Sequence, residues 1–178
     1  MIRKTREVNI SVEMDKGGID IKTDDNVLTH LLRTLFFYME RNVTIKATGD
    51  LPHHLWEDTG ITIAEELKSK IKKENIKRFG NAIMPMDDAL IIVAVDISRA
   101  YLNFDVTLSE EETGFEKSLA REFLWGFART LPATVHIKQL AGFNAHHIIE
   151  ASFKGLGKAL KEATGNSEKM FSTKGRIV

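Results

Sequence analysis

The hydrophobic pattern of the first half of this chain recurs, in the same order, in the second half. Alternating apolar residues predict strands, and apolar residues spaced three and four apart predict helices. In the first half this pattern predicts strands at 7–14, 19–21 and 43–47 and helices at 27–39 and 53–74. In the second half it predicts strands at 88–96, 101–107 and 133–138 and helices at 115–129 and 145–164. Each half therefore has the order ββαβα.

The residues themselves agree with this repeat. Val43-Thr44-Ile45-Lys46 and Val135-His136-Ile137-Lys138 occupy corresponding strands, and the helix that follows each of them opens with two histidines. An internal duplication of this kind predicts an α+β fold with pseudo-twofold symmetry, in which each sheet has its helices on one side. We expect the two halves to cover residues 1–84 and 85–178. Asp15-Lys16-Gly17-Gly18 predicts a turn that joins the first two strands as a hairpin.

The composition limits the chemistry that is available. The chain has no cysteine, which excludes disulfides, thiol catalysis, thiolate zinc sites and iron–sulfur clusters. Because 25 Lys and Arg residues balance 25 Asp and Glu residues, we expect no nucleic-acid partner and no membrane-surface partner. The first residues lack the apolar core of a signal peptide, and the longest apolar run, 89–95, is far shorter than the ~20 residues of a membrane helix. We therefore expect a cytoplasmic globular protein.

The pattern His-His-x-x-Glu occurs twice, at 53–57 and at 146–150. On a helix, either histidine can share a face with the glutamate, because residues three and four apart are neighbours. The two histidines of a pair point about 100° apart, which indicates that they serve different metal centres. A single pair of adjacent histidines is usually a surface feature, but two pairs with matched glutamates favour metal binding.

The remaining histidines fit the same interpretation. His30 opens the first helix, and His136 lies on the strand before the second histidine pair. The candidate ligands number eight, or two sets of four: His30, His53, His54, Glu57, His136, His146, His147 and Glu150. Imidazole and carboxylate ligands without thiolate suit Mn, Fe, Co, Ni or Zn. Four protein ligands on a six-coordinate ion would leave positions open for water or substrate, as in catalytic sites.

A second group of residues carries positive charge or hydroxyl groups: Arg78, Arg99, Lys154, Ser172 and Lys174. Taken alone, each is most simply a solvated surface residue. Beside a metal site, however, Arg and Lys together with hydroxyl donors are the usual ligands of an anion. These residues are therefore candidate contacts to a phosphate group of a substrate.

These residues resemble the imidazoleglycerol-phosphate dehydratase family of histidine biosynthesis. The resemblance covers nearly the whole chain and rests on segments 3–7 (RKTRE), 47–51 (ATGDL), 53–58 (HHLWED), 78–80 (RFG), 85–89 (PMDDA), 95–98 (VDIS), 142–151 (GFNAHHIIEA), 153–154 (FK) and 172–175 (STKG). It implies a duplicated α+β fold like the second domain of a small-subunit ribosomal protein. It also implies a homo-oligomer, a cubic 24-mer with metals at the subunit contacts.

The resemblance further implies an activity, that of a manganese-dependent lyase that dehydrates imidazole glycerol phosphate to imidazole acetol phosphate. Two Mn²⁺ per active site would be held by the eight ligands, and the phosphate by the basic and hydroxyl group of residues. The implied catalytic residues are Glu7, a candidate for proton transfer, with His30, Glu57 and Glu150. A metal-bound ring nitrogen would lose its proton, and departure of hydroxide would leave a diazafulvene-like intermediate.

Two other functions use the same residues. One is a dinuclear metal hydrolase that acts on a phosphorylated small molecule, which would release inorganic phosphate where dehydration would not. The other is a non-enzymatic assembly protein in which histidine pairs bridge subunits through metals whose coordination is closed.

Overall fold

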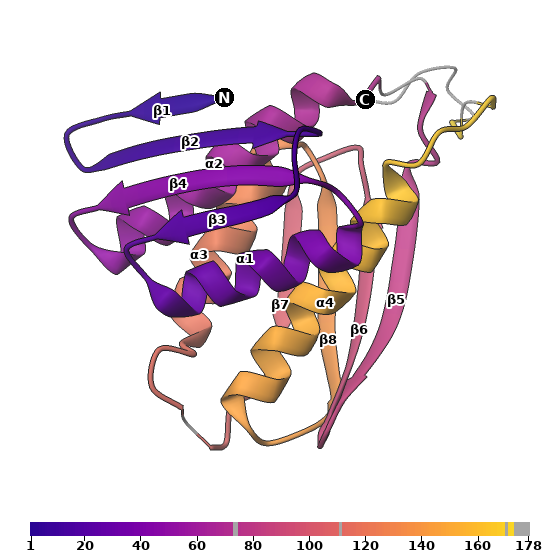
Figure 1. Cartoon of the computed structure of the whole chain (residues 1–178). Helices are drawn as coiled ribbons and strands as arrows, with labels where there is room; N and C mark the ends of the chain where they lie inside the picture. Colours follow the sequence, from indigo (N-terminus) through magenta and orange to yellow (C-terminus); the bar gives the residue numbers. More distant parts are fainter. Residues whose placement is uncertain (73–74, 111, 170, 173–178) are drawn as a thin grey trace.

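The computed structural model describes residues 1–72, 75–110, 112–169 and 171–172. The first half contains β1 (Ile2–Lys4), β2 (Val8–Met14), β3 (Ile19–Thr23), α1 (Asn26–Met39), β4 (Val43–Gly49) and α2 (Pro52–Lys70). The second half contains β5 (Phe79–Met86), β6 (Ala89–Asp96), β7 (Tyr101–Asp105), α3 (Lys117–Thr130), β8 (Thr134–Ala141) and α4 (Ala145–Ala163). The duplicated α+β architecture expected from the sequence is confirmed (Figure 1).

Each half also begins with a strand that the sequence pattern did not predict, β1 in the first half and β5 in the second. β1 has only three residues, which is too short for a periodic signal. In β5 the alternation is hidden, because apolar residues occupy both faces: Phe79 and Ile83 are exposed, while Ala82 and Met84 are buried. β5 pairs with β6, so the expected boundary after residue 84 falls within a strand of the second sheet.

The predicted hairpin between the first two long strands is wrong. The first sheet has the order β1-β2-β4-β3, so β4 separates β2 from β3. In this sheet Ile45 of β4 pairs with Val12 in an antiparallel register and with Ile21 in a parallel register. A parallel pair requires a crossover connection, and α1 supplies it. The second sheet has the same arrangement, β5-β6-β8-β7, with α3 as the crossover.

The helices of the two halves pack against each other, while each sheet carries its own helices on one face (Figure 1). α2 packs on α3, and α1 packs on α4, which also covers β5 and β6. Large buried aromatic side chains fill this layer: Phe36, Trp56, Phe123, Phe127 and Phe153. This packing brings the first turns of α1 and α4 together, although they are far apart in the sequence.

The helix boundaries follow the predictions closely, with one exception. α2 ends at Lys70, so the predicted helical residues 71–72 are not helical, and 73–74 lie outside the described residues. α4 begins at Ala145, where Asn144 caps it by accepting a hydrogen bond from the His147 N–H (3.0 Å). None of the described helices is long and apolar enough to cross a lipid bilayer.

Candidate metal centre

The first possible metal site lies where α1 meets α4. His30 Nε2 is 3.0 Å from Glu150 Oε2, and His146 Nε2 is 2.8 Å from the same oxygen. The rings of His30 and His146 lie 5.8 Å apart in an edge-to-face arrangement. His146 and Glu150 are one helical turn apart, so the helix itself sets their geometry, whereas His30 comes from the other half of the chain. The sequence therefore predicted these three donors, and the helix packing brings them together.

Helix caps and neighbouring side chains fix this group of three. Asp25 caps α1 by accepting from the Leu28 N–H (2.9 Å), and its other oxygen accepts from the indole N–H of the buried Trp56 (2.9 Å). On the α4 side, the ring of Phe115 stacks on His146 with 4.2 Å between centroids. His30 and His146 are thus held on elements whose ends are anchored to both halves of the core.

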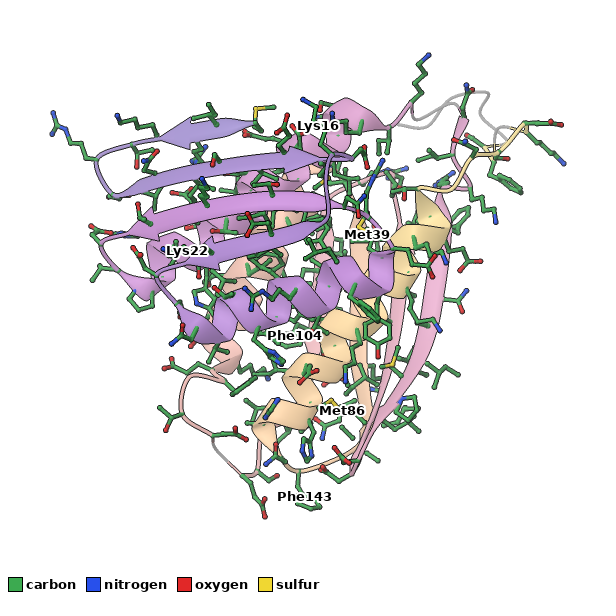
Figure 2. All side chains as sticks on the ribbon, viewed as in Figure 1. Lys16, Lys22, Met39, Met86, Phe104 and Phe143 are labelled. Carbon is green, nitrogen blue, oxygen red and sulfur yellow. The ribbon has the colours of Figure 1, made fainter. Side chains whose placement is uncertain are left out.

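Glu150 is the buried charge at the centre of this group. Burial opposes ionisation of its carboxyl group, but hydrogen bonds with Lys154 and the two histidines outweigh that effect and lower its pKa to about 2. Lys154 Nζ lies 3.1 Å from Glu150 Oε1 and 3.2 Å from the sulfur of Met86, which Figure 2 shows beside α4. Glu150 is therefore a carboxylate at neutral pH, which is the form that binds a metal ion.

A second group of possible ligands lies between α2 and α3. Its members are His53, Glu57 and Glu122. His53 Nε2 is 3.7 Å from Glu57 Oε2, as expected for residues one turn apart on a helix. Glu57 also forms an ion pair with Arg129 of α3, with 2.6 Å between Oε1 and Nη2. Within one chain, therefore, Glu57 is shared between a histidine and an arginine.

The other three histidines lie outside these two groups. His54 Nδ1 is 2.8 Å from Asp50 Oδ1, and this hydrogen bond raises the pKa of His54 against the opposing effect of burial. His147 Nδ1 is 2.5 Å from Asp88 Oδ1, and this contact likewise raises the pKa of His147. His136 is exposed on β8, where its ring lies 5.4 Å from that of Tyr101.

Of the predicted phosphate contacts that the structure describes, Lys154 lies apart from Arg78. Arg78 forms a bidentate ion pair with Asp96 (2.7 and 3.0 Å) and donates to the Phe171 carbonyl (2.9 Å). The Arg78 N–H donates to Ala163 at the end of α4, nine residues and about 13 Å of helix beyond Lys154. Arg99 is exposed between β6 and β7, and Ser172 is partly exposed. Lys174 lies outside the described residues.

Glu7, the candidate for proton transfer, lies at an exposed corner just before β2. Its backbone carbonyl accepts from the Asp50 N–H (3.0 Å), which places it next to the segment that precedes α2. The negative charge of Glu7 contributes, after the hydrogen bond of Asp50, to the raised pKa of His54. The fold thus brings Glu7 close to a predicted metal ligand.

Several acidic residues near these histidines were not selected from the sequence. They are Asp50 beside His54, Asp88 beside His147, Glu112 beside His146 (3.2 Å from Nδ1) and Glu122 beside His53. Asp50 lies four residues before His54, a spacing that carries a weak local signal. The others come from distant segments, so no spacing in the sequence indicates them.

The donor set suits a divalent transition-metal ion. His30, His146 and Glu150 offer two ring nitrogens and a carboxylate oxygen that lie within 4.8 Å of one another. Neutral imidazole and carboxylate are ligands that Mn²⁺ and its neighbours accept. The described parts of the two groups therefore fit metal binding, although neither supplies four donors from the predicted set.

Known proteins of one enzyme family are similar to this chain over nearly its whole length. Residues 23–160 match the family model described as imidazoleglycerol-phosphate dehydratase. The dehydratase of Pyrococcus furiosus is 57% identical over 98% of this chain and 99% of its own length, and that of Metallosphaera sedula is 38% identical over 99% and 96%. Crystal structures of the enzymes from P. furiosus, in complex with (S)-C348, and Staphylococcus aureus superimpose with TM-scores of 0.95 and 0.82. These structures share 57% and 34% identity with the chain and cover 98% and 94% of it, and 99% and 98% of their own chains. The chain therefore belongs to the imidazoleglycerol-phosphate dehydratase family, a family of lyases in histidine biosynthesis.

Proposed function

We propose that this chain dehydrates imidazole glycerol phosphate to imidazole acetol phosphate, with two Mn²⁺ ions per active site. The observation that carries the proposal is the convergence of His30 and His146 on one oxygen of Glu150, in a chain of this family. Family membership favours dehydration over the phosphate hydrolase and the non-enzymatic assembly protein. We place the enzyme in the cytoplasm, where biosynthetic enzymes of this kind act.

The ligand residues would bind the metals and orient the substrate ring. His30, His146 and Glu150 would form one centre, while His53 and Glu57 would contribute to the other. When bound, Mn²⁺ would supply Lewis acidity, which favours loss of a ring proton and thereby the departure of hydroxide. Glu150 would keep its negative charge throughout, because its pKa is about 2.

Glu7 would move protons during the reaction. Its carboxylate is exposed, and among the described residues no side chain forms an ion pair or hydrogen bond with it. A general acid or base must reach the substrate and must not be committed to a structural contact. Glu7 meets both conditions, and its position near His54 places it beside a predicted metal ligand.

The substrate phosphate would be bound by residues from several segments. Lys154 lies beside the first metal group and would neutralise negative charge there. Arg78 would hold the chain one residue before Ser172, since it donates to the Phe171 carbonyl. Arg99, Ser172 and Lys174 would complete the phosphate site. Binding the remote phosphate positions the reacting end of the substrate, which lowers the barrier.

We infer that each active site combines residues of different subunits in a homo-oligomer, in agreement with the 24-mer that the resemblance implies. His54, His136 and His147 point to this arrangement, because they are predicted ligands that the single chain leaves outside both groups. The outer face of the second sheet also exposes apolar side chains: Phe79, Ile83, Tyr101 and Leu140. A surface of that kind favours contact with another subunit.

Turnover by metal-free protein tests the reaction and the cofactor together. We expect imidazole acetol phosphate to form from imidazole glycerol phosphate when Mn²⁺ is added, and not before. The ketone and inorganic phosphate are measured in the same samples. Release of phosphate without ketone would instead identify a hydrolase, and failure to form either product would refute the proposed activity.

Mixed assemblies test whether the sites are shared between subunits. His30→Ala and His136→Ala are each expected to be inactive alone, but subunits of the two variants refolded together should regain part of the activity. The regain would come from sites that combine an intact His30 of one subunit with an intact His136 of another. His30→Ala mixed with His146→Ala is the matched control, because one chain supplies both residues to the same group. If neither mixture regains activity, the sites are not shared in this way.

A further inference from the structure

The second histidine of each pair has an aspartate at the same ring nitrogen. His54 Nδ1 faces Asp50 (2.8 Å), and His147 Nδ1 faces Asp88 (2.5 Å). The two aspartates come from different places: Asp50 precedes α2, the helix that carries His54, whereas Asp88 lies between β5 and β6 and contacts His147 on α4. The two halves of the chain thus reach the same contact from different positions.

Asp88 is itself held rigidly. Its Oδ2 accepts hydrogen bonds from the backbone N–H groups of Phe143 (2.6 Å) and Asn144 (3.2 Å), just before α4, and Figure 2 shows Phe143 at this turn. Asn144 in turn caps α4 through the His147 N–H. Asp88 therefore ties the start of β6 to the first turn of α4 and leaves little freedom for the His147 ring.

A carboxylate at Nδ1 determines which nitrogen of a neutral imidazole carries the proton. The Nδ1–H tautomer donates to the carboxylate, and the lone pair on Nε2 stays available for a metal ion. Nε2 of the half-buried His147 lies 3.5 Å from a carboxylate oxygen of Asp87, which is an exposed side chain. A metal at that nitrogen would lie at the surface, within reach of a second subunit.

The internal duplication also relates Asp88 to an acidic residue of the first half, Glu7. Glu7 and Asp88 occupy equivalent positions, because each immediately precedes the second strand in the order of its sheet, β2 or β6. In the second half the residue at this position, Asp88, contacts the ring of His147. In the first half Asp50 performs that task, and the carboxylate of Glu7 is left without a hydrogen-bond partner among the described residues.

We propose that Asp50 and Asp88 are positioning residues that keep His54 and His147 in the Nδ1–H tautomer and so present Nε2 of each as the metal-binding nitrogen. The proposal rests on the proposed function, in that it takes both histidines to be metal ligands. It also gives a reason why Glu7 and Asp88 would differ in role: in the first half Asp50, and not Glu7, contacts the histidine ring.

The test uses Asp88→Asn and Asp50→Asn in the full-length chain, with Asp20→Asn as the control. Asp20 is an exposed carboxylate on the outer face of β3, so its loss changes the net charge equally. Histidine ring ¹⁵N shifts of the metal-free protein, at a pH where the rings are neutral, report the tautomer. Titration with Mn²⁺ reports the affinity. Single histidine substitutions assign the six rings.

We expect the Nδ1–H tautomer at His54 and His147 in the unsubstituted protein. Each aspartate substitution should shift its own histidine toward the other tautomer and weaken Mn²⁺ binding roughly 10- to 100-fold, while Asp20→Asn changes neither. If stability falls but the tautomers and the affinity are unchanged, Asp50 and Asp88 are merely structural and the proposal is overturned. Asp50→Asn keeps the test valid if Asp88→Asn does not fold, because Asp50 lacks the backbone contacts to the α4 turn.

Failure of the positioning proposal can be distinguished from failure of the proposed dehydratase activity. The tautomers and Mn²⁺ affinities are measured without substrate. A protein that shows the expected shifts but makes no ketone would refute the dehydratase activity and support the positioning role. If the protein makes the ketone but the aspartate variants show no tautomer shift, the dehydratase activity is supported and the positioning role is refuted.

Discussion

The carboxylate of Glu150 interacts with three side chains, and the sequence motif indicates only one of them, His146. Its carboxylate is buried between two imidazoles and the Lys154 ammonium group, and these contacts keep it ionised at neutral pH. Without these partners burial would raise the pKa of this carboxyl group, because burial disfavours the charged form. The same interactions that prepare Glu150 for a metal therefore also link the stability of the fold to pH.

Comparison of Glu150→Gln with the unsubstituted protein tests this link. The pKa of Glu150 is lowered from 4.5 to about 2 in the folded protein, so its contribution to stability is fully present above pH 4.5 and is lost as the pH falls toward 2. At pH 7 we expect the variant to be less stable by about 1–3 kcal/mol. Urea unfolding of metal-free protein should show this difference shrinking between pH 4.5 and 2. A difference that is independent of pH would contradict the assignment.

At the scale of secondary-structure elements, the packing of strand β5 on α4 requires a close approach of the two backbones at Gly80. A Cβ atom at Gly80 would lie 1.9 Å from the Ala159 carbonyl oxygen and 2.9 Å from the Ala163 nitrogen. Both are backbone atoms of a helix, which cannot move aside as a flexible side chain can. The glycine of the Arg78-Phe79-Gly80 segment thus allows the second sheet to pack directly on the helix that carries His146 and Glu150.

We therefore expect Gly80→Ala to lower the free energy of unfolding by about 1–3 kcal/mol, as overpacked sites do. Gly18→Ala is the control, since no atom lies within 4 Å of a Cβ at Gly18. That change should stay within about 0.5 kcal/mol of the unsubstituted protein. Urea unfolding curves measure both. Equal effects of the two substitutions would show that β5 tolerates a side chain against α4.

At the scale of the whole protein, the two duplicated halves differ on their outer sheet faces. In the first sheet this face carries mostly polar side chains, such as Asn9, Glu13 and Lys46, and Ile2 of β1 is an exposed apolar residue on it. In the second sheet it exposes Phe79, Ile83, Tyr101 and Leu140, each of which has between 49% and 65% of its surface accessible. His136 lies on the same face. The two halves therefore share one hydrophobic core but differ in their outer surfaces.

Ile83→Lys tests whether the apolar face is a subunit contact. A charge at the centre of a buried interface is costly, so we expect the variant to sediment as a smaller species than the unsubstituted protein. Asn9→Lys places the same charge on the polar face of the first sheet and should leave the assembly intact. Analytical ultracentrifugation measures both variants. An unchanged assembly in Ile83→Lys would show that the subunits associate through another surface.

The features that the sequence alone determined depend on residues that are close together in the chain. Apolar spacing predicted α1, α2, α3 and α4, and the repeat predicted two similar α+β halves, because helix and strand periods are properties of neighbouring residues. The His53–Glu57 and His146–Glu150 pairs followed in the same way from one helical turn. The family was also recognisable from its motifs.

The tertiary structure decided whatever depends on contacts between distant segments. His30 reaches Glu150 across 120 residues only because α1 packs on α4, and Asp88 and Glu112 approach the histidines from separate loops. The order of strands is decided in the same way: the turn at Asp15 permits a hairpin, but β4 pairs with both β2 and β3 and separates them. Side-chain periodicity states which face of a strand is buried, and it carries no information about which strand lies beside it.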